Sequence, residues 1–108
     1  MTGDQQPIDV ARNARTVEWL KAELAGGLAG VFRAMWSGRT DAVTESLAVI
    51  VMTAYLLARR LGVSFSQLDS KLMGYLRTNI EEEHEIERWY GDLSALSEHW
   101  QNRRGSLS

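Results

Sequence analysis

The chain has 108 residues, of which 44% are hydrophobic, and a formal net charge of −2 at pH 7, which fits one small globular domain. It contains no cysteine, so disulfides and thiolate metal sites are excluded, and a reducing cytoplasm is the expected location. Residues 81–98 carry seven acidic side chains and one basic side chain, an imbalance that argues against nucleic acid as a partner.

The first predicted helix runs from about Asn13 to Ser37. Apolar residues recur there at spacings of three and four, which is typical of one buried helical stripe: Val17, Leu20, Leu24, Leu28, Val31 and Met35. Three glycines lie beside this stripe, and each costs a helix about 1 kcal/mol relative to alanine: Gly26, Gly27 and Gly30. Either another helix approaches closely at these glycines, or the helix is locally broken. The polar residues 1–12 are expected to form a flexible tail.

The second predicted helix begins at a Thr40 or Asp41 cap and runs to about Leu61, with Gly62 as the residue that follows it. Residues 47–58 are apolar nearly all round, a pattern typical of a helix that is buried on several sides. This stretch of twelve residues is too short to span a bilayer, which takes about twenty, so no membrane partner is expected. A monomer of this size can hardly cover such a helix, whereas a homo-oligomer with this helix at its centre can.

The third predicted helix follows a capping box formed by Ser64 and Gln67. It continues through the charged residues 81–88 until Gly91, and Asp92 then caps a short last helix that ends near Trp100. Residues 101–108 are expected to form a second flexible tail. The sequence thus predicts one all-α domain at residues 13–100, a helical bundle of three long helices plus a short C-terminal helix, assembled as a homo-oligomer that is either a dimer or a tetramer.

An acidic run at residues 80–87 offers one candidate for metal chemistry. On a continuous helix Glu81, Glu82 and Glu85 fall on neighbouring positions, and carboxylates at such spacing can share magnesium or manganese. Glu81 and His84 also have the spacing used in di-iron helical bundles, although such a site needs two of these motifs and further glutamates. The alternative interpretation is a solvated acidic face.

Two aromatic residues, Trp89 and Tyr90, follow the acidic run. Their faces could stack a nucleobase while a metal ion holds its phosphates, or they could close the end of a core. Residues 26–30 match neither the dinucleotide-binding nor the P-loop pattern, so Walker-type nucleotide binding is not expected. No spacing indicates a Ser/His/Asp arrangement, and the sequence therefore identifies no catalytic residue.

Several segments carry a resemblance to a known family. Residues 55–63 (YLLARRLGV) and 64–68 (SFSQL) resemble the MazG-type all-α nucleotide pyrophosphohydrolases, in which a helix ending in leucine, glycine and an aliphatic residue precedes a capped third helix. Residues 18–24 (EWLKAEL) and 85–94 (EIERWYGDLS) resemble more closely a short bacterial group, the MazG-like family. The resemblance implies a helical domain of this superfamily.

The resemblance also implies hydrolysis of nucleoside triphosphates to monophosphate and pyrophosphate. In the superfamily, magnesium is held by an E-E-x-x-E motif on the first helix and an E-x-x-D or E-E-x-x-D motif on the second. Only the first glutamate of each motif is present here, Glu23 and Glu45. The remaining motif positions carry Leu24, Gly27, Ser46 and Val49.

Because these motif positions lack carboxylates, we expect a non-catalytic or weakly active oligomer that binds a nucleotide or a partner protein. The alternative is an active magnesium-dependent pyrophosphohydrolase with a rearranged site. In that site Glu23 and Glu45 are joined by the carboxylates of the acidic run, Glu81, Glu82 and Glu85. The sequence leaves open whether the chain is an enzyme.

Overall fold

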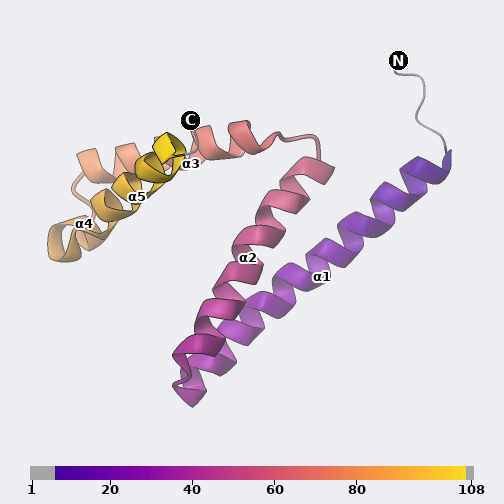
Figure 1. Cartoon of the computed structure of the whole chain (residues 1–108), viewed down its shortest axis with the longest axis horizontal. Helices are drawn as coiled ribbons and strands as arrows, with labels where there is room; N and C mark the ends of the chain where they lie inside the picture. The colour runs from indigo at the N-terminus through magenta and orange to yellow at the C-terminus, as the bar shows by residue number, and fades with distance from the viewer. Residues whose placement is uncertain (1–6, 107–108) are drawn as a thin grey trace. The chain divides into compact units, whose positions relative to one another are not determined.

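The computed structural model describes residues 7–106, and no strand occurs in that range (Figure 1). Its five helices are α1 (Pro7–Ser37), α2 (Thr40–Arg60), α3 (Phe65–Glu81), α4 (Glu85–Tyr90) and α5 (Asp92–Ser106). The predicted all-α class is confirmed, with five helices where four were expected. The chain divides into two compact units, an N-terminal unit up to Phe65 and a C-terminal unit from Ser66 onward.

The first and last helices are longer than their periodicity predicted. α1 begins at Pro7 rather than Asn13, and a proline suits the first position of a helix because the N–H it lacks would have no partner there. α5 ends at Ser106 rather than near Trp100. Residues 7–12 and 101–106 of the two expected tails are therefore helical, whereas residues 1–6 and 107–108 lie outside the described residues.

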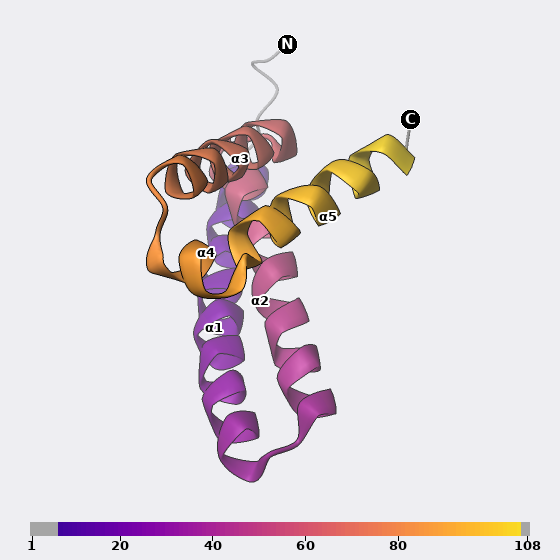
Figure 2. The same ribbon diagram turned by 90° about the vertical axis from the view of Figure 1, so that its left-hand side faces the viewer.

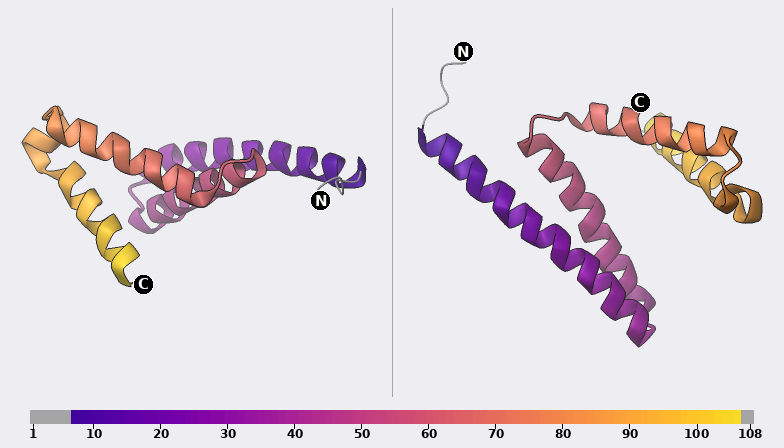
Figure 3. Two further views of the ribbon diagram at one scale, coloured as in Figure 1. Left: turned by 90° about the horizontal axis from the view of Figure 1, so that it is seen from above. Right: turned by 180° about the vertical axis from the view of Figure 1, so that it is seen from behind.

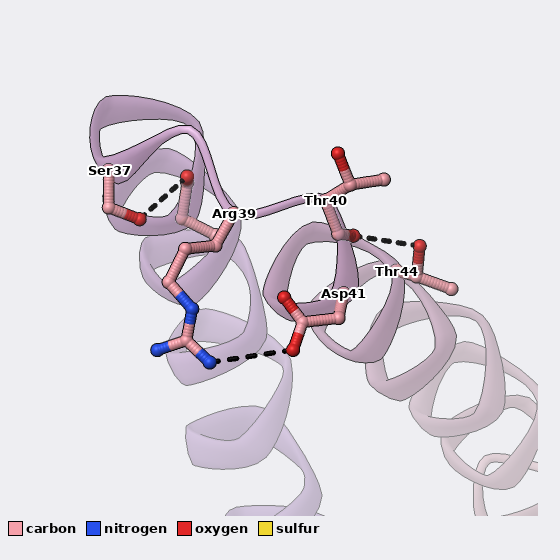
Figure 4. A network of polar contacts seen from close by, with 6 residues as sticks. Ser37, Arg39, Thr40, Asp41 and Thr44 are labelled. Carbon is pink, nitrogen blue, oxygen red and sulfur yellow. Dashed lines mark hydrogen bonds and ion pairs between the residues drawn. The ribbon is translucent and has the colours of Figure 1, made fainter.

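A two-residue turn joins α1 to α2 and makes the N-terminal unit a helical hairpin (Figure 2). Gly38 has φ +73°, a conformation that favours glycine, and the Arg39 N–H donates to the Ala34 carbonyl at 3.3 Å. Arg39 takes the N-cap position of α2 without a side-chain cap, so the predicted cap at Thr40 or Asp41 is wrong. The Arg39 guanidinium lies 3.4 Å from the Asp41 carboxylate, whose charge suits the first turn of a helix (Figure 4).

Small side chains bring α1 and α2 into close contact. A Cβ added at Gly27 would lie 3.1 Å from Ile50 Cγ1, and one added at Gly30 would lie 2.8 Å from Ser46 Oγ. Because α1 is continuous through these glycines, close approach of the second helix explains Gly27 and Gly30, and a local break does not. Gly26 faces open space. The buried side chains of the hairpin are Leu20, Val31, Ala34 and Thr53.

α2 ends in a glycine turn, as its sequence predicted. Gly62 has φ +90°, and the Val63 N–H donates to the Ala58 carbonyl at 2.9 Å. α1 and α2 diverge toward this end of the hairpin (Figures 1 and 3). Asn13 still links them, because its Nδ2 donates to the Arg60 carbonyl at 3.4 Å and its Oδ1 accepts from Arg60 Nη1 at 3.3 Å.

The third helix does not continue through the acidic run, so that prediction is wrong. α3 ends at Glu81, and Glu83 takes φ +53°, in the left-handed region that ends helices. His84 then caps α4, because its Nδ1 accepts a hydrogen bond from the Ile86 N–H at 3.1 Å. Carboxylates four residues apart repel one another on a helix and are unfavourable near its C-terminal end, so a break at this point relieves both effects.

The break between α4 and α5 lies at Gly91, which has φ +68°. The Glu87 carboxylate spans it, since one oxygen accepts from the Ser94 N–H at 3.0 Å and the other from the Ser94 hydroxyl. These bonds lower the pKa of Glu87, and the bond from the Ser94 side chain is the larger cause. Ser94 lies in the first turn of α5, where backbone N–H groups have no partner within the helix.

Large apolar side chains of the hairpin remain exposed, among them Trp19, Leu28, Phe32, Met35, Trp36, Leu47, Val51, Met52 and Leu56. Within the described residues, α2 is the one helix long and apolar enough to cross a membrane, by length and composition only. The apolar stretch of twelve residues is by itself too short to span a bilayer, whereas the whole of α2 has 21 residues and is about 32 Å long. This is weak grounds for a membrane partner, because a central helix of a soluble bundle passes the same test.

Candidate functional site

The site implied by the resemblance lies where α1 and α2 touch. Gly27 and Val49 occupy two positions at which the superfamily carries carboxylates, and a Cβ added at Gly27 would lie 3.4 Å from Val49 Cγ1. Ser46 occupies a third such position, and its hydroxyl oxygen lies against Gly30. Small and apolar residues therefore pack one helix against the other at the place where the resemblance expects magnesium.

The two glutamates that remain from these motifs, Glu23 and Glu45, are exposed. The glycine contacts set an antiparallel register in which Glu23 falls opposite Thr53, eight residues from Glu45. Eight residues correspond to about 12 Å along a helix that rises roughly 1.5 Å per residue. The register therefore does not place Glu23 and Glu45 opposite one another on the two helices.

The predicted metal ligands of the acidic run occupy three different environments. Glu81 is the last residue of α3, Glu82 lies in the following turn, and Glu85 is the first residue of α4; all three are exposed. The break at Glu83 removes the helical spacing between Glu81 and His84 on which the di-iron interpretation depended. Across the described part of the chain, no group of three or more His, Asp or Glu side chains is placed to hold a metal ion.

Glu81 also lines an open pocket of about 410 Å³ between α3 and α5. The Arg77 side chain lines the same pocket, so the pocket contains charges of both signs. The other lining residues are Met73, Ile80, Ser97 and Gln101. A carboxylate beside a guanidinium is a poorer cation ligand than one of a cluster of carboxylates, because the positive charge repels the incoming ion.

The predicted nucleobase-stacking residues, Trp89 and Tyr90, are 65% and 71% exposed. Their rings meet edge to face, with centroids 6.4 Å apart and an interplanar angle of 90°. Perpendicular rings leave no parallel slot for a base between them, although each outer face stays accessible. Neither residue lines the pocket between α3 and α5 or the pocket of the hairpin.

The pocket of the hairpin was not predicted from the sequence. It has a volume of about 440 Å³, lies where α1 and α2 diverge, and is lined by Thr16, Trp19, Leu20, Leu56, Arg59, Arg60 and Phe65. Two signals could have revealed it. Trp19 is a large aromatic residue outside the apolar stripe of α1, and Arg59 and Arg60 are adjacent basic residues at the end of an otherwise apolar helix.

The model of the MazG-like family matches residues 10–93. The match extends from α1 to the first turn of α5 and includes both the hairpin and the acidic run. Comparison with curated proteins and comparison with solved structures give no match.

Proposed function

This chain belongs to the MazG-like family, and from that premise we propose that it is a homo-oligomer with a degenerate metal site that binds a nucleotide or a partner protein. On this proposal it is non-catalytic or weakly active and lies in the cytoplasm, with neither nucleic acid nor a membrane as a partner. The observation that supports it best is the contact between Gly27 and Val49, two positions at which the pyrophosphohydrolases of the superfamily carry carboxylates.

Magnesium-dependent hydrolysis needs several carboxylates at one place. The ion must be held firmly while it keeps coordination sites for water and for phosphate oxygens. Within one chain, the register places Glu23 eight residues from the position opposite Glu45, and the described residues contain no group of three or more His, Asp or Glu side chains that could hold a metal ion. Within a single chain, the described residues therefore do not fit the magnesium that the superfamily uses.

An apolar side of the hairpin supports the homo-oligomer. On α1, Leu28 and Phe32 each come one position after a residue that faces α2. On α2, Leu47 and Val51 each come one position after a residue that faces α1. Successive residues are about 100° apart around a helix. In an antiparallel pair, side chains that come one position after the inward-facing residues therefore point to the same side of the pair. These four residues are all exposed, and a second copy of the chain would cover them.

A screen of nucleoside triphosphates with magnesium and with manganese tests the proposed loss of chemistry. We expect pyrophosphate release no faster than in buffer, from protein whose helical circular dichroism shows that it is folded. Glu23→Gln and Glu45→Gln should keep the oligomer and its stability, because both side chains are exposed. Metal-dependent release of pyrophosphate that either substitution abolishes would contradict the proposal.

A second candidate function is an active pyrophosphohydrolase whose metal site forms between copies of the chain. It is favoured by the exposure of all five candidate ligands, Glu23, Glu45, Glu81, Glu82 and Glu85, which leaves them free to meet across an interface. Magnesium or manganese would be the cofactor, and an outer face of Trp89 or Tyr90 would stack the base. This candidate predicts turnover that rises with oligomer formation and falls in Glu81→Gln and Glu85→Gln. Exposed Glu98 is outside the predicted set, so Glu98→Gln is the matched control.

A further inference from the structure

We propose that the pocket of the hairpin binds a planar aromatic molecule that carries an anionic group. Its volume of about 440 Å³ lies within the range of about 300–1,000 Å³ typical of small-molecule sites. Its lining combines apolar and aromatic side chains with two guanidinium groups. Every lining residue belongs to the N-terminal unit, so the pocket is complete within that unit. The proposal does not depend on whether the chain hydrolyses nucleotides.

Aromatic and aliphatic side chains form the apolar part of this pocket. Trp19 of α1 is 58% exposed, and Phe65 at the start of α3 is 39% exposed, so both rings are accessible to a ligand. Tyr55 meets the Phe65 ring edge to face, with centroids 5.8 Å apart, which restricts how that ring can turn. Leu20 and Leu56 add aliphatic surface from the two helices. Such a lining favours a flat, apolar ring system.

Two adjacent arginines give the pocket its positive charge. The Arg59 Cζ lies 5.1 Å from the centroid of the Phe65 ring, a cation–π contact that orients the guanidinium. Arg60 is positioned by Asn13, whose Oδ1 accepts a hydrogen bond from Arg60 Nη1. Neither contact is with a carboxylate, so neither neutralises the charge. Guanidinium groups bind the oxygens of phosphates and carboxylates in pairs, which makes an anionic group the matching ligand chemistry.

The C-terminal end of α2 offers another explanation for Arg59 and Arg60. The helix dipole places about half an elementary negative charge there, and a basic residue stabilises it. Two guanidinium groups carry more positive charge than this end of the dipole can neutralise. The pocket between α3 and α5 is lined by both Arg77 and Glu81 and by no aromatic residue, so it does not combine the two features.

A nucleoside monophosphate and an aromatic carboxylate both combine a flat aromatic ring system with an anionic group, so either could be the ligand. Isothermal titration of the full-length chain with adenosine monophosphate and with indole-3-acetate distinguishes these sources. Adenosine and inorganic phosphate each carry one half of the chemistry and serve as reference ligands. We expect at least one aromatic anion to bind about tenfold more tightly than either reference, because ring stacking and charge pairing act together.

Substitutions locate the binding on the hairpin. Trp19→Ala and the double substitution R59M/R60M should each weaken the affinity about tenfold, because each removes one half of the recognition. Trp36→Ala and Arg33→Met are matched controls on α1, since neither residue lines the pocket, and their affinities should stay within about twofold. Trp19→Phe restores an aromatic face and should recover most of the affinity. Circular dichroism confirms the fold of each variant.

Three results would overturn the proposal. The first is that neither adenosine monophosphate nor indole-3-acetate binds the folded chain at millimolar concentration. The second is that adenosine or inorganic phosphate alone binds as tightly as the aromatic anions. The third is that Trp36→Ala or Arg33→Met lowers the affinity as much as the pocket substitutions do, which would place the binding elsewhere.

Discussion

A Cβ atom on Gly30 would stand 2.8 Å from the Oγ of Ser46, closer than unbonded carbon and oxygen atoms approach. The missing Cβ therefore determines how near α1 and α2 come to one another. A second contact of the same kind, between Gly27 and Ile50, lies one turn away. A carboxylate side chain at position 27, where the superfamily motif has one, would crowd Ile50 at this spacing of the helices.

Placing one carboxylate of the superfamily motif back into this contact should destabilise the hairpin. We expect Gly27→Glu to lower the free energy of unfolding by about 2 kcal/mol, because crowding against Ile50 and burial of a charge outweigh the helix propensity gained. Gly26→Glu is the matched control, since a Cβ there meets nothing within 4 Å. It should stabilise the helix by about 0.5 kcal/mol or more. Urea unfolding followed by circular dichroism measures both, and equal effects would contradict the close contact.

The buried leucine of α1 should contribute more to stability than an exposed leucine of the same hairpin. Leu20 is 2% exposed, so Leu20→Ala should lower the free energy of unfolding by about 2–4 kcal/mol. Leu61 is 63% exposed, and Leu61→Ala should cost less than about 1 kcal/mol. Both are measured at one protein concentration, because an oligomer's stability depends on concentration. A similar cost for the two variants would argue against the packing of Leu20.

The apolar side of the hairpin predicts which substitutions separate the copies of the chain. Phe32→Glu and Val51→Glu place a charge on that side and should raise the dissociation constant of the oligomer at least about tenfold. Met52 is also exposed but precedes the inward-facing Thr53, so it turns to the other side, and Met52→Glu is the control. Sedimentation velocity over a concentration series measures the change. A monomeric wild-type chain at all concentrations would contradict the oligomer.

The contact between Glu87 and Ser94 makes the junction of α4 and α5 sensitive to acid. Hydrogen bonds from Ser94 hold the pKa of Glu87 below its ordinary value of 4.5. A carboxyl group whose pKa is lower in the folded state stabilises the fold above its unfolded pKa, and that contribution is lost as pH falls through the folded pKa. We therefore expect the junction to loosen only below about pH 4.5.

An NMR titration of the Glu87 carboxyl carbon tests this expectation. Ser94→Ala removes the larger of the two hydrogen bonds and should raise the pKa of Glu87 toward its ordinary value. Ser97→Ala changes another serine of α5, one that donates none of the hydrogen bonds that lower this pKa, and should leave the titration where it is. An unchanged pKa in Ser94→Ala would show that the hydrogen bond is not the cause of the shift.

The hairpin was the part of the fold best predicted from the sequence, because its determinants are local. The spacing of apolar residues places Leu20 and Val31 correctly on the inward side of α1, and Gly62 marks the end of α2. Leu28 and Met35 belong to the same predicted stripe but are 50% and 63% exposed, so that part of the prediction is wrong. The sequence could not decide between close approach and a break at Gly27 and Gly30. That choice depends on which residues of the second helix face the glycines, and their register follows only from the folded pair.

The acidic run was predicted poorly because two properties of its glutamates oppose each other, their helix propensity and the repulsion between their carboxylates. Glutamate favours a helix in isolation, and the pattern from Glu81 to Arg88 therefore extended the third helix. In the structure Glu83 adopts a left-handed conformation and the chain turns. The hairpin pocket was missed for a different reason. Trp19 and Phe65 are separated by 46 positions, and no short-range pattern predicts that they line the same pocket.

The two-residue connection between α1 and α2 also bears on when the hairpin forms during synthesis. A short connection closes at a small cost in chain entropy, and contacts between residues near in sequence form quickly. Both helices are complete once Arg60 has left the ribosome, before the whole C-terminal unit has emerged. We therefore expect the apolar side of the hairpin to be exposed first on an unfinished chain. A neighbouring nascent chain on the same messenger RNA is then the nearest copy that can cover it.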